Sequence, residues 1–382
     1  MNNTLEGTTQ QPAAPEERSF VLDDRSMAPA AVRTPGIGAW IEERTGVNSA
    51  WRAARAWPMP RYAATNVLYA LGGLTLASLL FQMLSGCLLA FYYDPSAADA
   101  YNSVDYIMYQ VPLGWLIRGV HHYNAGAIVL LVFAHTLRTF FYSTYKRPRE
   151  ITWLSGVFLL LVALGFGFTG YLLPWDQKGY WATVVSTQIA DKVPVVGETI
   201  SHLMKGGAAL GQLTLTRFYV VHVAVLPVTI ILLILVHLQQ VRRHGIAPSV
   251  TKRGRPEGAS TVPWYPSWLG MVALLALGLL ALLVFLSWRT HAPLEYPADP
   301  SSTDYNPRPE WYFLFLFQLL SYAPGAWEPY LIVLVPGIVI GSMIVLPFID
   351  KGEERRPWRK PITTAIAVFY VAVIAIFTAI AW

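Results

Sequence analysis

Long apolar runs recur along the chain and set its fold class. They cover residues 66–91, 120–141, 153–173, 218–238, 268–288, 331–349 and 364–382. Most reach the roughly 20 residues that a helix needs to cross about 30 Å of hydrocarbon. The pattern predicts an all-α polytopic membrane protein with about seven transmembrane helices. Residues 62–245 are expected to form a four-helix bundle, and residues 263–382 a three-helix C-terminal region.

The polar segments around these runs are expected to lie outside the membrane interior. The first 60 residues are Pro-rich and have no apolar core of the kind found in a signal peptide, and residues 1–38 are expected to be disordered. Residues 39–61 carry Trp side chains among basic ones, which predicts an amphipathic helix at the membrane interface. A charged leader without such a helix explains that pattern equally well. Residues 246–262 are expected to be a linker on the inner side.

The basic residues indicate how the helices cross the membrane. Lys and Arg gather before the first apolar run, between the second and third, between the fourth and fifth, and between the sixth and seventh. The loop between the first and second runs carries Asp94, Asp99 and Asp105 instead. The positive-inside rule then places the N-terminus inside and the C-terminus outside. The formal net charge of +5 is therefore attributed to membrane orientation, and no nucleic-acid partner is expected.

Two of the apolar runs contain histidines at matched positions. His121 and His135 lie fourteen residues apart in the second run, and His222 and His237 lie fifteen apart in the fourth. Fourteen residues of α-helix rise about 21 Å, and their ends differ in direction by only about 40°. The two helices are expected to run parallel, which pairs His121 with His222 near the outer face and His135 with His237 near the inner face. An ionisable side chain inside an apolar helix is costly and usually marks function.

Haem is the group that suits two histidines inside a bilayer. Zinc normally takes four protein ligands, whereas haem iron takes two axial ligands and its porphyrin is apolar. Glycines in the first and third runs have the same fourteen-residue spacing; they are Gly72 and Gly86, and Gly156 and Gly170. Glycine permits close approach between helices, although helix packing alone would explain one such pair. The sequence thus predicts two bis-histidine b-type haems that form an electron path across the membrane.

Two further residues bear on the cofactors. Arg118 lies one turn before His121 and is a candidate to neutralise a haem propionate; an ordinary interfacial arginine is the alternative. Cys87 is the only cysteine, which excludes a cysteine-ligated iron–sulfur cluster and a paired-cysteine haem attachment within this chain.

A carboxylate among aromatic residues predicts a second site at the outer edge. Glu310 stands in NPRPEWYFLFLFQ (306–318), after two prolines and before an apolar run. The stretch GYLLPWDQKGYWATVVST (170–187), at the outer end of the third run, is equally aromatic. A quinol needs an apolar cleft for its ring and a base for its protons, and the two stretches together offer both. A helix cap would explain Glu310 alone.

These motifs resemble those of cytochrome b in the bc and b-six-f quinol oxidoreductases. The resemblance runs from about residue 40 to about residue 350 and rests on WLIRGVHHYNAG, GYLLPWDQKGYW, TLTRFYVVH and RPEWYF, with the paired glycines and the histidine spacing. The fifteen residues between His222 and His237 are similar to the b-six-f branch, and the last three apolar runs resemble its subunit four, here fused to the same chain. Ala70 stands where that branch has a cysteine holding an extra haem, so a covalent third haem is not expected.

The resemblance implies roles for individual residues. Glu310 would accept the protons of quinol, with Tyr312 and Tyr171 nearby. Arg242 matches a position near the inner quinone site, although a basic flank on the inner side explains Arg242 almost as well. The implied partners are a Rieske iron–sulfur protein, a c-type cytochrome subunit, quinone, and a second copy of the complex in a homodimer.

The activity that follows from the resemblance is electron bifurcation. Quinol at the outer pocket would give one electron to the Rieske protein and the other to the outer haem. The second electron would pass to the inner haem and reduce quinone at the inner face, contributing to a proton gradient across what is expected to be a bacterial inner (cytoplasmic) membrane. Two alternatives stay open: a di-haem membrane anchor of another quinone reductase, and a transporter with intramembrane histidines, which would show no haem spectrum.

Overall fold

The chain divides into two compact units, Met1–Ala53 and Ala54–Trp382. The structure is a computed structural model that describes residues 36–247, 260–302, 304–323 and 325–382. Residues 1–35 of the predicted disordered tail and residues 248–259 of the predicted linker lie outside the described residues.

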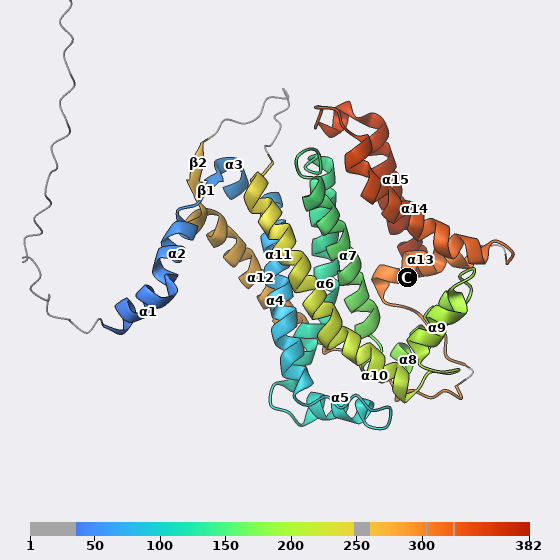
Figure 1. The fold of residues 1–382 in the computed structure, drawn as a ribbon. Coiled ribbons are helices and arrows are strands. Elements are labelled where there is room, and N and C mark those ends of the chain that lie inside the picture. Colours follow the sequence, from blue (N-terminus) through green and yellow to red (C-terminus); the bar gives the residue numbers. More distant parts are fainter. Residues whose placement is uncertain (1–35, 248–259, 303, 324) are drawn as a thin grey trace, which may run out of the picture. The chain divides into compact units, whose positions relative to one another are not determined.

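Seven helices in the described ranges are long and apolar enough to cross a membrane, which confirms the predicted all-α membrane fold. They are α4 (Leu71–Ala90), α6 (Gly114–Phe141), α7 (Glu150–Gly170), α10 (Gln212–Val220) continued by α11 (Leu226–His244), α12 (Leu269–Thr290), α14 (Glu328–Ile349) and α15 (Pro361–Ala381) (Figure 1). Shorter helices lie between them: α3 (Arg61–Ala64), α5 (Ala100–Tyr109), α8 (Gln177–Asp191), α9 (Gly197–Lys205) and α13 (Trp311–Ser321). Two short strands, β1 (Pro58–Pro60) and β2 (Thr261–Pro263), pair antiparallel.

The prediction of a single helix over residues 39–61 is wrong, because this segment contains two helices. The first, α1 (Ile37–Thr45), ends at Gly46, whose φ of 60° lies in the left-handed region that favours glycine. The second, α2 (Val47–Arg55), begins directly after it. The Glu42 carboxylate accepts hydrogen bonds from two backbone N–H groups in the first turn of α2 (2.6 and 2.9 Å) and so caps it. A position at the membrane interface stays a prediction.

Four helices form the centre of the larger unit: α6 packs against α4 and α7, and α7 packs against α11 (Figure 1). Halfway along the bundle, Leu79, Ile128, Ala163 and Ile230 form one buried cluster that takes one residue from each helix. Each of these residues lies midway between the two glycines or the two histidines of its own helix. The cluster is therefore an apolar layer that separates two levels of the bundle.

Buried polar side chains join α4 to α6. Asn124 is fully buried and donates to the carbonyl oxygen of Ser78 and to Oε1 of Gln82 (2.8 and 2.9 Å), and it accepts a hydrogen bond from Oγ of Ser78 (2.6 Å). Gln82 in turn donates to the carbonyl oxygen of His121 (3.1 Å). Polar groups inside a membrane need such partners, so this network fixes the register of α4 against α6 beside His121.

The C-terminal helices are tied to the bundle by a cluster of charges. Lys146, between α6 and α7, donates to the Asp350 carboxylate at the end of α14 (2.7 Å) and to two carbonyl oxygens of the loop that follows. Lys360, before α15, pairs with the other carboxylate oxygen, to which Tyr145 donates (2.5 Å). Partial burial favours protonation of Asp350, but the hydrogen bonds from Lys146, Lys360 and Tyr145 outweigh it and hold the pKa of Asp350 below its usual value.

Asp350→Asn is expected to loosen the attachment of the C-terminal helices. The substitution leaves the buried ammonium groups of Lys146 and Lys360 without their counter-charge, at a cost of about 2–3 kcal/mol, between the values for exposed and fully buried pairs. Thermal unfolding of the purified protein measures this loss. The pKa of Asp350 is lowered on folding. Its contribution to the free energy of unfolding is therefore fully present above the unfolded-state pKa and is lost as the pH falls through the folded-state pKa.

The difference between Asp350→Asn and the parent protein should therefore shrink in acid. Lys351→Ala, which changes the exposed neighbouring residue, is the control and should melt like the parent. Equal melting temperatures for Asp350→Asn and the parent at neutral pH would contradict the assigned role.

Candidate functional site

His121 and His222 each face a glycine of a neighbouring helix. We call the part of the bundle that contains these two histidines the outer level. A Cβ atom added to Gly86 of α4 would lie 3.0 Å from Cε1 of His121, and one added to Gly170 of α7 would lie 2.7 Å from Cε1 of His222. Both distances are too short for an unstrained contact, so each imidazole occupies the space that a glycine leaves open. The centroids of the two imidazole rings are 6.5 Å apart.

The other two histidines repeat this arrangement in the inner level, the level of His135 and His237. A Cβ atom on Gly72 of α4 would lie 3.0 Å from Cε1 of His135, and one on Gly156 of α7 would lie 3.5 Å from Cε1 of His237. The two histidines are close enough to interact electrostatically. The structure thus brings the eight predicted histidines and glycines together as two sets of four, with the apolar layer between them.

A π-helical turn accounts for the unequal histidine spacings. His222 lies in the turn Val221–Val225, where the N–H of Leu226 bonds to the carbonyl oxygen of Val221, five residues earlier. Such a turn holds one residue more than an α-helical turn, and it lies beside Pro227, which has no N–H to continue the α-helical pattern. Because this turn contains one extra residue, His222 and His237 face the same way although they are fifteen residues apart.

Hydroxyl groups fix the protonation of three imidazoles. In each case Nδ1 lies 3.0 Å from a hydroxyl oxygen; the pairs are Ser85 with His121, Thr169 with His222 and Ser155 with His237. Each hydroxyl also lies 2.8–2.9 Å from a carbonyl oxygen of its own helix, which can only accept a hydrogen bond. All groups are satisfied only if the hydroxyl donates to the carbonyl and accepts from Nδ1–H. Nε2 of the imidazole then carries the lone pair that a metal ion needs.

This donor set fits haem. Within the described residues, no group of three or more His, Cys, Asp or Glu side chains is placed to hold a metal ion. Two neutral imidazoles alone do not complete the coordination of a zinc ion, whereas haem iron needs only two axial ligands from the protein. The 6.5 Å between the outer rings leaves room for one metal ion between them, and metal–imidazole bonds are about 2.0–2.1 Å long.

Arginines lie one turn beyond each level. Arg118, three residues before His121, donates to the carbonyl oxygens of Ala292 and Pro293 (2.9 and 2.6 Å) after α12. Arg138, three residues after His135, was not predicted as a site residue. Its guanidinium lies over the ring of Tyr69 (3.8 Å to the centroid), and its buried Nε and Nη2 have no hydrogen-bond partner among the described residues. Its spacing from His135 mirrors that of Arg118 from His121 and was the available signal. Arg138 can therefore bind a carboxylate, while the predicted contact of Arg118 with a propionate stays a prediction.

Glu310 lies in a cluster that includes the two predicted tyrosines. Its side chain is 19% exposed and forms an ion pair with Lys178 of α8 (2.7 Å). Tyr171 and Tyr312 both interact electrostatically with Glu310. Lys178 was not predicted as a site residue, although it is the only basic residue in the aromatic stretch 170–187.

The tyrosines cannot serve as bases in this cluster. Burial raises the pKa of Tyr171 to about 12, and burial together with the charge of Glu310 raises the pKa of Tyr312 above its usual value. Both hydroxyls therefore stay protonated at neutral pH and can donate hydrogen bonds. The carboxylate of Glu310 is the group in this cluster that can take up a proton.

Asp176 fixes the start of the helix that carries Lys178. Its carboxylate caps α8 by accepting a hydrogen bond from the N–H of Gly179 (2.8 Å), and it also accepts from the N–H of Glu295 (3.3 Å). The loop before Glu310 is thereby attached to α8. This link brings two stretches that are distant in sequence into one site.

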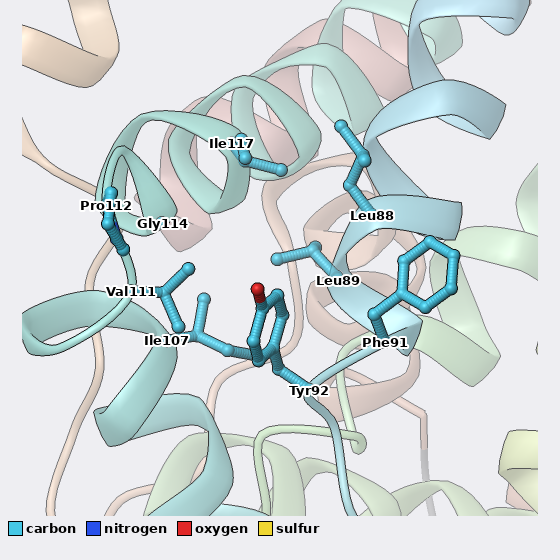
Figure 2. Close-up of a pocket in the computed structure, with 9 residues that line it drawn as sticks. All are labelled: Leu88, Leu89, Phe91, Tyr92, Ile107, Val111, Pro112, Gly114 and Ile117. Atoms are coloured by element: carbon cyan, nitrogen blue, oxygen red, sulfur yellow. The ribbon is translucent and has the colours of Figure 1, made fainter.

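An apolar cavity of about 400 Å³ lies elsewhere, between the ends of α4, α5 and α6 (Figure 2). Its walls are Leu88, Leu89, Phe91, Tyr92, Ile107, Val111, Pro112, Gly114 and Ile117. None of the predicted catalytic or ligand residues lines this cavity. The guanidinium of Arg242 lies over the ring of Trp57 (4.9 Å), and its place near an inner quinone site stays a prediction.

Two family models match the chain in succession. The one described as cytochrome b/b6/petB matches residues 57–245, and the one described as cytochrome b(C-terminal)/b6/petD matches residues 297–382. The cytochrome b6 of Porphyra purpurea is 43% identical over 208 residues, which are 54% of this chain and 96% of the relative. The chain belongs to the cytochrome b family. The cytochrome b6 of Desmonostoc sp. (strain PCC 7906) matches the same shares at 42% identity.

The comparisons also establish the fused organisation of this cytochrome b. A b6-like bundle and a petD-like region follow each other on one chain, as predicted. Among solved structures, a chain of a hyperthermophilic respiratory Complex III is similar with a TM-score of 0.80 and 30% identity, covering 90% of this chain and 91% of that one. Membership of this family argues against both alternatives, a di-haem membrane anchor of another quinone reductase and a transporter with intramembrane histidines.

Gly170→Ala is expected to displace the ring of His222, and Gly156→Ala to leave that of His237 in place, so the first variant should bind less haem than the second. The new Cβ would lie 2.7 Å from the ring of His222 in the first variant, but at an ordinary contact distance of 3.5 Å from that of His237 in the second. The ratio of haem to protein, from the visible spectrum of the reduced proteins, measures the difference. Equal ratios in the two variants would show that the glycine contacts do not hold the histidines in position.

Proposed function

We propose that this cytochrome b oxidises quinol at the outer face of the membrane and passes electrons to the inner face through two b-type haems. His121 and His222 hold the outer haem, and His135 and His237 hold the inner one. The observation that supports this proposal most is the contact of four imidazoles with four glycines at two levels of one bundle. When bound, each haem supplies a one-electron carrier.

The bundle residues position the haems and exclude water from them. The hydroxyls beside three of the histidines orient the rings and leave Nε2 available to the iron. The layer around Leu79 and Ile128 keeps the two levels apart. Arg138 offers two unpaired N–H groups to a haem carboxylate at the inner level.

Quinol oxidation takes place at the Glu310 cluster. The reaction releases two electrons and two protons, and Glu310 accepts a proton from the quinol hydroxyl. Lys178 holds the carboxylate in place through its ion pair, while the protonated Tyr171 and Tyr312 are available as hydrogen-bond donors to the quinol oxygens. His122, next to the ligand His121, interacts electrostatically with Glu310, which supports a position of this cluster beside the outer level.

The two electrons leave the cluster by different routes. One goes to a Rieske iron–sulfur protein outside this chain, and the other enters at the level of His121 and His222. The second electron passes to the level of His135 and His237 and reduces quinone at the inner face. Because protons are released outside and taken up inside, the reaction contributes to a proton gradient.

The chain acts as one subunit of a quinol oxidoreductase complex. The b6-type relatives and the Complex III neighbour support this place, and the proposed partners are a Rieske protein, a c-type cytochrome subunit and a second copy of the complex. The basic segments support an inside N-terminus. The fusion of both regions on one chain and Ala70 in place of a cysteine support a bacterial cytoplasmic membrane. Ala70, which is fully buried and has no thiol, supports the proposal that no third haem is covalently attached.

Glu310→Gln is expected to slow quinol oxidation by about 100-fold or more, because the amide cannot accept the proton. Both haems should remain bound, since Glu310 lies outside the histidine levels. Turnover of the purified complex with a quinol and an oxidised electron acceptor measures the rate, and the visible spectrum measures the haem content.

Glu328→Gln is the matched control for this substitution. Glu328 begins α14 and also pairs with a lysine, Lys192 (2.5 Å), but it is not part of the Glu310 cluster. This variant should turn over at the parent's rate. A Glu310→Gln variant that oxidises quinol as fast as the control would refute the role of Glu310.

A further inference from the structure

The hydroxyl groups that bind the histidines are distributed unequally between the two levels. At the outer level, Ser85 and Thr169 each accept a hydrogen bond from an Nδ1–H group. At the inner level only Ser155 does so. Nδ1 of His135 is buried and has no hydrogen-bond partner among the described residues.

The missing hydroxyl has a cause in the sequence. Each hydroxyl residue directly precedes the glycine that faces its histidine, and before Gly72 this position is occupied by Leu71. The side chain at this position therefore leaves Nδ1 of His135 without a hydroxyl acceptor.

We infer that the hydroxyls of Ser85, Thr169 and Ser155 each lower the potential of the haem at their level, and that Leu71, which stands where a fourth hydroxyl would be, leaves the potential of the inner haem higher than a hydroxyl residue there would. This inference rests on the proposed binding of a haem at each level. An acceptor on Nδ1–H makes the imidazole a stronger electron donor to the iron and so favours the oxidised state. The outer haem has two such ligands and the inner haem has one.

The test is a redox titration of the full chain purified with its haems, followed by visible spectroscopy. Leu71→Ser supplies the missing hydroxyl and should lower the higher of the two potentials while leaving the lower one in place. The expected change is about tenfold in the ratio of oxidised to reduced haem at a fixed potential, or about 59 mV for one electron. Thr169→Val removes a hydroxyl at nearly constant volume and should raise the lower potential by a similar amount.

Leu71→Ala is the control, because it removes the same bulk without adding a hydroxyl, and both potentials should stay at the parent's values. Ser155→Ala removes the hydroxyl beside His237 at the inner level and should raise the higher potential. A shift as large in Leu71→Ala as in Leu71→Ser would overturn the inference, since packing would then be the cause. Unchanged potentials in Leu71→Ser, Ser155→Ala and Thr169→Val, with two haems bound, would overturn it as well.

These outcomes are distinct from a failure of the proposed function. A parent protein that binds no haem, or whose haem survives replacement of all four histidines, would refute haem binding between the histidine pairs and with it the inference. If the parent binds two haems and the histidine variants lose them, but the hydroxyl variants leave both potentials unchanged, only the inference is refuted.

Discussion

The bundle depends on the contact between each histidine ring and a glycine of the adjacent helix. A side chain even one carbon larger at Gly170 would meet the ring of His222 at 2.7 Å. The contacts set the helix spacing and the direction of each imidazole at the same time. Because they repeat fourteen residues apart on α4 and α7, they generate two levels, and the apolar layer around Leu79 and Ala163 keeps those levels separate.

The polar groups inside this apolar bundle are few and mostly paired, as a membrane interior requires. Asn124 has partners on α4, and the hydroxyls satisfy three imidazoles and a helix carbonyl each. Among the described residues, the buried atoms without a hydrogen-bond partner include Nδ1 of His135 and Nε and Nη2 of Arg138. Both residues lie at the inner level. The two levels therefore differ in the hydrogen bonds of their histidines: both outer imidazoles have a hydroxyl partner, but only one of the two inner imidazoles does.

Much of the fold and the pairing of histidines with glycines follows from the sequence, because both depend on local periodicity. The apolar runs fix the seven helices, and the spacing of Gly72 and Gly86 matches that of the histidines on a regular helix. Other features depend on contacts across the chain. The pairing of Lys178 with Glu310 requires a loop held by Asp176, and nothing periodic connects those residues. The π-helical turn at His222 breaks the regular helix that the spacing argument assumes, and the break between α1 and α2 depends on one left-handed glycine, Gly46.

The central claim is that the four histidines hold two haems, and the haem content of the purified chain tests it most directly. Haem extracted into acid acetone and measured as its pyridine complex gives the number of haems per chain, and any haem left on the protein is covalent. The account predicts two extractable b-type haems per chain and none left behind. A single haem, or no haem, would contradict the two-level arrangement, and a haem that resists extraction would contradict the interpretation of Ala70.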